Sequence, residues 1–188
     1  MTNQSLIRDL KLGVATGDYK VTIDNSALPN SLYYFFKKRR TVKDFLDRGM
    51  ILCGSRALNC YRINGKKLLN RKPNDWDFLV TKDQFIEICR DYKIYDFDLT
   101  KSQYHLNKSL ASFSTGYGGE SHWFPCFIQL IIQDELPNSI ESGGVRFASL
   151  ENIIEAKMDL ANPIAVNQRA DSKHQMDINN IIVNTYSL

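Results

Sequence analysis

Two short apolar runs, each ending at small or polar residues, constrain most strongly what this chain can fold into. The first is MILC at 50–53, which stops at a Gly-Ser pair, and the second is WDFLV at 76–80. Runs of roughly four to eight apolar residues between turn signals are typical of buried strands. A third run, CFIQLIIQ at 126–133, places its residues alternately on two faces and predicts another strand. Together the runs predict a sheet.

Helical periodicity surrounds these strands. The pattern predicts helices over about 32–48, 55–62 and 81–92 and a closing pair over 150–161 and about 170–185, with weaker strand candidates at 19–23, 93–99 and 104–114. Mixed helices and strands in this order indicate an α/β or α+β domain, a mixed sheet flanked by helices. The length of 188 residues predicts a single domain over 1–188, with a core at about 31–135 and C-terminal helices at about 149–185.

Composition excludes some classes of protein. No apolar stretch is long enough to cross a membrane, and the charged N-terminal segment does not resemble a signal peptide, so we expect a cytoplasmic protein. The net charge of +3 is only mildly basic and permits a nucleic-acid partner without arguing for one. The cysteines form no C-x-x-C pair and are expected to be buried free thiols: Cys53, Cys60, Cys89 and Cys126.

A pair of acidic residues at the second strand is the first candidate site. Asp75 and Asp77 are two positions apart, so an extended chain projects both carboxylates from one side. Two close carboxylates repel each other, and a divalent cation such as magnesium relieves that repulsion. The turn at Gly54 and Ser55 supplies a complementary half, because glycine permits close approach and the amides that begin the next helix attract phosphate.

The order strand, Gly-Ser, helix, then a strand opening with D-x-D resembles the DNA polymerase beta-like nucleotidyltransferase superfamily. The tail, SLENIIEAKMDLA…RADSKHQMDINNI, is similar to that of the small nucleotidyltransferases of abortive-infection toxin type. With this tail included, the resemblance spans most of residues 45–185. It implies the polymerase beta-like fold with a C-terminal helical pair.

The resemblance also implies an activity, the transfer of a nucleoside monophosphate from a nucleoside triphosphate to RNA or tRNA, a protein or a small molecule. Asp75 and Asp77 would then bind Mg²⁺ (or Mn²⁺), and Gly54, Ser55 and Arg56 would hold the triphosphate. Lys157 would join them. Its helix carries an apolar stripe of Leu150, Ile153, Ile154, Leu160 and Ala161, and Lys157 lies within that stripe, so it either snorkels or reaches an anion.

One position departs from the superfamily pattern. The neighbouring strand usually carries a third carboxylate, and here Gln129 stands in that place. An amide can bind a metal through its carbonyl oxygen but adds no negative charge and cannot act as a base. A substitute could come from Asp134, Glu135, Asp96 or Asp98. The alternative is a catalytically impaired module of the same fold that binds a nucleotide, RNA or a protein partner.

Two further features leave alternatives open. The sequence predicts a loop at 62–74. It separates the Gly-Ser turn from Asp75 by more residues than is usual in the superfamily, and it carries five basic and no acidic residues. It is either a solvated insertion or an electrostatic collar that attracts a nucleic acid or polyphosphate. Lys173 and Asp177 are four residues apart on one predicted helix, and a local ion pair is the preferred interpretation.

Overall fold

The computed structural model describes residues 3–29, 41–73, 75–91, 112–114, 128–161 and 172–186. In chain order its elements are α1 (Asn3–Thr16), β1 (Val21–Ile23), η1 (Asn25–Ala27), α2 (Thr41–Asp47), β2 (Ile51–Cys53), α3 (Gly54–Cys60), β3 (Tyr61–Ile63), β4 (Lys66–Lys67), β5 (Trp76–Thr81), α4 (Lys82–Asp91), β6 (Ser112–Ser114), β7 (Ile128–Gln133), β8 (Ser139–Ser142), β9 (Val145–Ala148), α5 (Leu150–Ala161) and α7 (Ser172–Tyr186).

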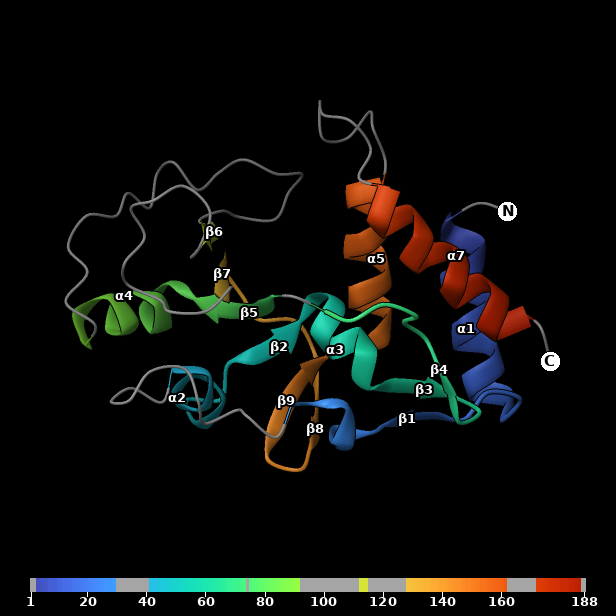
Figure 1. The fold of residues 1–188 in the computed structure, drawn as a ribbon, viewed down its shortest axis with the longest axis horizontal. Helices are drawn as coiled ribbons and strands as arrows, with labels where there is room; N and C mark the ends of the chain where they lie inside the picture. The colour runs from blue at the N-terminus through green and yellow to red at the C-terminus, as the bar shows by residue number, and fades with distance from the viewer. Residues whose placement is uncertain are drawn as a thin grey trace.

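A mixed sheet forms the centre of the molecule, with strand order β6-β7-β5-β2-β9-β8 (Figure 1). Strand β5 pairs with β7 in parallel and with β2 in antiparallel orientation, and β2 pairs with β9 in parallel. The three apolar runs became β2, β5 and β7, because Ile51, Leu52, Phe78 and Leu130 are fully buried in the core. The predicted mixed α/β class is therefore confirmed.

A second, smaller sheet has the order β1-β3-β4 and was not expected in full. The sequence analysis assigned 62–74 to a loop, and this is wrong for its first part, where β3 and β4 form a hairpin. Its turn consists of Asn64 and Gly65, both with positive φ. An Asn-Gly pair between two extended segments is a strong signal for a two-residue hairpin, and the signal was present in the sequence.

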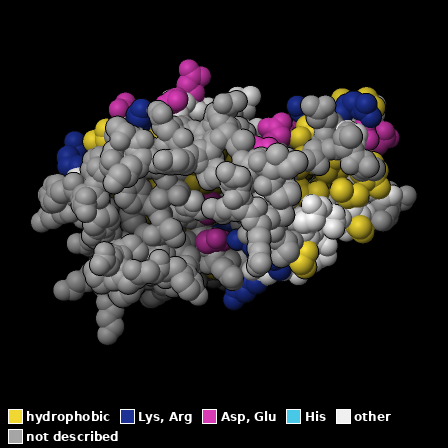
Figure 2. All heavy atoms as spheres, turned by 90° about the horizontal axis from the view of Figure 1, so that it is seen from above, with side chains coloured by type: hydrophobic (Ala, Val, Ile, Leu, Met, Phe, Trp, Pro, Cys, Tyr) yellow, Lys and Arg dark blue, Asp and Glu magenta, His cyan; other side chains and the backbone are white. Residues whose placement is uncertain are grey.

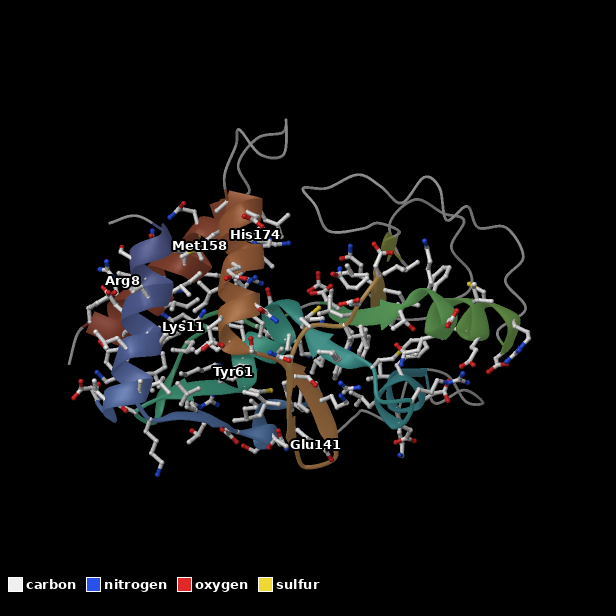
Figure 3. All side chains as sticks on the ribbon, turned by 180° about the vertical axis from the view of Figure 1, so that it is seen from behind. Arg8, Lys11, Tyr61, Glu141, Met158 and His174 are labelled. Carbon is white, nitrogen blue, oxygen red and sulfur yellow. The ribbon has the colours of Figure 1, made fainter. Side chains whose placement is uncertain are left out.

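Helices α1, α5 and α7 lie together at one end of the molecule, next to the small sheet (Figures 1 and 3). The predicted C-terminal pair is confirmed as α5 and α7. On α5 the buried face consists of Leu150, Ile153, Ile154, Lys157 and Met158, whereas Leu160, assigned to the apolar stripe from the sequence, is 42% exposed. The Tyr61 hydroxyl group donates a 2.7 Å hydrogen bond to the carbonyl oxygen of Ala148 just before α5, linking β3 to this helix.

Some predicted elements fall outside the described residues, namely the beginning of the helix expected at 32–48, the strand at 93–99 and most of the strand at 104–114. Helix α2 and strand β6 occupy the described parts of the first and last of these segments. None of the helices in the described ranges combines the length and the hydrophobicity needed to cross a membrane.

Candidate functional site

Gly54 and Asp77 are in direct contact at the point where β2 ends. Cys53 is the register partner of Asp77 across the β2–β5 pair, so the chain turns into α3 beside the Asp77 carboxylate. Gly54 has φ of +63°, and a Cβ atom at this position would overlap Oδ2 of Asp77. Glycine is thus required for its backbone conformation and for the space it leaves to the aspartate. The two motifs predicted from the sequence form one site.

The Asp77 carboxylate lies in an environment that penalises negative charge. Burial raises the pKa of Asp77 to about 7, and the neighbouring charge of Asp75 adds to the increase. Lys157, Lys173 and Arg56 act in the opposite direction without forming an ion pair with Asp77 in the described part of the chain. Near neutral pH, Asp77 is therefore a carboxyl group whose ionisation a nearby cation would favour.

Gln129 occupies the position that the sequence analysis assigned to it. It is the register partner of Asp77 in the parallel β5–β7 pair, so the two side chains leave the same face of the sheet on strands about 4.8 Å apart. Asp134 cannot replace Gln129. It follows the end of β7, about 16 Å from Gln129 at ~3.3 Å per residue. Its side chain is 75% exposed and faces Lys82. Glu135 is exposed next to it, whereas Asp96 and Asp98 lie outside the described residues.

Next to Gly54, the side chains of Ser55, Arg71, Lys157 and Asp177 form a polar network, which we call the Ser55 network. Ser55 of α3 accepts hydrogen bonds from Lys157 Nζ of α5 at 3.0 Å and from Arg71 Nη2 at 2.7 Å. Asp177 of α7 accepts from Lys157 Nζ at 2.7 Å and from Nε and Nη2 of Arg71 at 2.9 and 2.7 Å. Lys157 does reach an anion, and that anion is Asp177.

The Ser55 network contains more cationic than anionic side chains. Burial by itself would raise the pKa of Asp177, but hydrogen bonds and charges from Arg71 and Lys157 outweigh it and hold this pKa below its usual value. Burial lowers the pKa of Lys157, and the hydrogen bond to Asp177 opposes this change. Two cations share one carboxylate, so the network keeps a net positive charge beside Ser55.

The network corrects the interpretation of the pair Lys173 and Asp177. The ion pair expected between Lys173 and Asp177 is replaced as the main interaction of Asp177 by Arg71 and Lys157, which come from other elements. Lys173 is exposed on α7, and its charge lowers the pKa of Asp77. Neither Arg71 nor Asp177 was assigned to the site from the sequence, because their meeting depends on how α7 packs against the segment after β4.

Arg56 is placed differently from the expectation that it helps to hold the triphosphate. Its Nε donates to the carbonyl oxygen of Asp75 at 2.9 Å and its Nη2 to that of Pro73 at 3.1 Å. The guanidinium group also lies 4.2 Å from the centre of the Trp76 ring. These contacts fix the chain that leads into β5, so Arg56 acts on the site by positioning Asp75.

The cysteines in the described residues are the buried free thiols that the sequence predicts. Cys53, Cys60 and Cys89 are unbridged and buried, and Cys126 lies outside the described ranges. Burial raises the pKa of Cys60 and of Cys89 to about 11. Burial, followed by the charge of Asp77, raises the pKa of Cys53 as well. Cys53 adjoins the site but is not an ionised nucleophile there.

One face of the molecule carries charged side chains of both signs close together. Figure 2 shows acidic and basic atoms side by side near the middle of one face, and hydrophobic side chains gathered at the end of the molecule that carries α1 and α7. In the described part of the chain, no group of three or more His, Cys, Asp or Glu side chains is arranged to hold a metal ion.

Comparisons with known proteins give two matches. A family model described as a domain of unknown function (DUF7277) matches residues 50–122, a range that contains Gly54, Ser55, Asp75 and Asp77. The crystal structure of JHP933 from Helicobacter pylori is similar at a TM-score of 0.44 and 20% sequence identity, over 88% of this chain and 68% of that one. No curated protein matches the chain.

Proposed function

We propose that this protein is a magnesium-dependent nucleotidyltransferase of the polymerase beta-like fold. The observation that carries the proposal is the contact between Gly54 and Asp77, with the Ser55 network beginning at the residue that follows the glycine. An acidic group suited to a metal and a cationic group suited to phosphate thus adjoin across one turn. A nucleoside triphosphate bound with a divalent cation carries both partners that such a site requires.

The residues present fit a divalent cation in one respect in particular. Asp75 and Asp77 would hold Mg²⁺ or Mn²⁺, because the cation would offset the charge that burial and mutual repulsion make unfavourable on Asp77. The carbonyl oxygen of Gln129 is available at the same register of the sheet. When bound, the cation would neutralise negative charge on the reacting phosphates.

The protein groups have separate roles in this proposal. Gly54 leaves room for the Asp77 carboxylate, while Ser55 and Lys157 bind the phosphates that leave as pyrophosphate. Arg56 holds the chain at Pro73 and Asp75 and so orients the first carboxylate. The acceptor would be RNA or tRNA, a protein or a small molecule.

A second candidate function is supported by Gln129. Because an amide faces Asp77 where a third carboxylate would activate the acceptor hydroxyl, the chain could bind a nucleotide, RNA or a protein partner without catalysing transfer. This binding module would use the same Ser55 network and the same metal pair. The two functions differ in turnover and not in the site that they use.

The test is a calorimetric titration of ATP, CTP, GTP and UTP with and without magnesium, on the wild type and on Asp77→Ala. Magnesium-dependent binding that Asp77→Ala abolishes would support a nucleotide site at Asp77. If none of the four triphosphates binds to the wild type, the proposal is wrong. Pyrophosphate release with an RNA or protein acceptor then separates the two functions, since the binding module releases none.

A further inference from the structure

The basic segment between β4 and β5 is attached to α7 along one side of that helix. Asn184 Nδ2 donates to the carbonyl oxygen of Lys67 at 2.9 Å, and Asn70 Nδ2 donates to Asn180 Oδ1 at 3.1 Å. Asp177 completes this row with its contacts to Arg71. Positions 177, 180 and 184 are spaced by three and four residues and therefore share one face of the helix. We call residues 66–73 the inserted segment.

The inserted segment is also anchored from inside. Leu68 and Leu69 are fully buried in the core, and Pro73 is buried at its end. Burial of the two leucine side chains stabilises the packing of the segment against the core. A solvated insertion, one of the two possibilities left open by the sequence, does not describe this segment. Its backbone is fixed on both sides of Arg71.

Arg71 projects from this fixed backbone onto Ser55. Its side chain is 28% exposed, whereas that of Lys157 is 3% exposed, so Lys157 is the inner cation of the Ser55 network and Arg71 the outer one. Asp177 binds Arg71 through two parallel hydrogen bonds, which fix the plane of the guanidinium group. Arg71 is therefore held at the open edge of the cationic half of the site.

The hydrogen bonds of Ser55 indicate what this half of the site can bind. A hydroxyl group has one hydrogen to donate and can accept two hydrogen bonds, and Ser55 already accepts one from Arg71 and one from Lys157. Its hydrogen is thus directed to a further acceptor. With two cations polarising the hydroxyl oxygen, an anionic acceptor such as a phosphate oxygen suits this donor best.

We propose that Arg71 is a further triphosphate-binding residue, presented to the terminal phosphates by the inserted segment and positioned by Asp177. This inference rests on the proposed function and deepens it. The site would select its ligand by the number of linked phosphates. Of the two phosphates that leave as pyrophosphate, Lys157 and Ser55 would contact the inner one and Arg71 the terminal one. An anion with three linked phosphates would bind more tightly than one with a single phosphate.

The test compares two substitutions that each remove one positive charge from the inserted segment, Arg71→Met and Lys72→Met. Lys72 is exposed and lies outside the Ser55 network. We would titrate magnesium tripolyphosphate, magnesium ATP and AMP into each protein and into the wild type. Arg71→Met should lose about tenfold or more in affinity for the two triphosphate ligands, as expected for a charge-assisted hydrogen bond, and Lys72→Met less than about threefold. Affinity for AMP should change little in either variant.

The outcomes separate this inference from the proposed function. If the wild type binds neither tripolyphosphate nor any of the four nucleoside triphosphates, both are wrong. If it binds them and Arg71→Met binds equally well, only the role of Arg71 is wrong. Equal losses for triphosphates and AMP would also contradict the role, because a purely structural arginine affects all ligands alike. Should Arg71→Met fail to fold, Arg71→Lys keeps a cation for Asp177 and should still reduce the preference for triphosphate over AMP.

Discussion

Two buried aspartates within one site, Asp77 and Asp177, are in opposite electrostatic states. Burial and a neighbouring carboxylate raise the pKa of Asp77 to about 7. Asp177, with 0% of its side chain exposed, has its pKa lowered by ion pairs with Arg71 and Lys157. Burial opposes ionisation of both groups, so the difference comes from the hydrogen bonds and close ion pairs that Asp177 makes with Arg71 and Lys157.

The comparison suggests that the two carboxylates have different partners. Asp177 is satisfied within the fold and holds α5, α7 and the inserted segment together. Asp77 has no ion-pair partner among the described residues, and the charges of Lys157, Lys173 and Arg56 only partly offset the effect of its burial. Sites that bind ligands commonly keep such destabilised groups, whereas purely structural groups are fully paired. Substitutions at the two positions should therefore have opposite effects on stability.

The largest effect is expected for Asp177→Asn. The change removes the buried carboxylate that Lys157 and Arg71 share, and removing one partner of a buried ion pair costs about 3–5 kcal/mol. Urea unfolding would measure the difference. The control is Asp47→Asn, which removes an exposed ion pair with Lys43 and should cost less than about 1 kcal/mol. Equal losses in both variants would show that the Ser55 network does not stabilise the fold.

Gly54→Ala should destabilise the protein by about 2–3 kcal/mol, through backbone strain at positive φ and overlap with the Asp77 carboxylate. Gly17→Ala is the matched control, because Gly17 has φ of +82° and open space around it. That variant should lose only the strain, about 1 kcal/mol. Thermal melting of both measures the difference, and the same loss in each would mean that Asp77 does not press on Gly54.

Asp77→Asn should stabilise the protein near pH 8 by about 2 kcal/mol. This is part of the few kcal/mol by which a pKa shift of this size changes the free energy of unfolding. A raised pKa means that the folded state holds the proton more tightly than the unfolded chain. The stability of the wild type should therefore fall as the pH rises from about 4 to about 7. The variant should lack this fall and equal the wild type near pH 4. A variant that is less stable at every pH contradicts the assignment.

The smallest effect is expected for Asn184→Ala, which removes the hydrogen bond to Lys67 that holds the inserted segment. Relative to Asn179→Ala on the same helix it should cost about 1 kcal/mol, since both changes raise helix propensity equally. Asn179 is exposed and bonds only within α7, to Gln175, among the interactions in the described residues. Thermal melting compares the two variants. No difference between them would show that α7 does not hold the segment in place through Asn184.

The sequence by itself determined strands β2, β5 and β7, the closing helices and part of the site. Short apolar runs can bury their side chains only as strands of a sheet, and the two-residue spacing of Asp75 and Asp77 places them on one side of an extended chain. Gly54 was identifiable because only glycine combines a positive φ with close approach. Gln129 could be located because β7 alternates clearly. These features depend on neighbours in the chain.

The tertiary structure decided how the cationic half is assembled and added Arg71 and Asp177 to Ser55 and Lys157, which were assigned to the site from the sequence. Arg71, Lys157 and Asp177 are far apart in the sequence, and nothing in their local pattern distinguishes them from a solvated basic run, a snorkelling lysine and a helical ion pair. They meet because burial of Leu68, Leu69 and the apolar face of α5 brings the inserted segment and α7 against Ser55. Long-range packing sets which charges are neighbours, and a linear pattern does not carry that information.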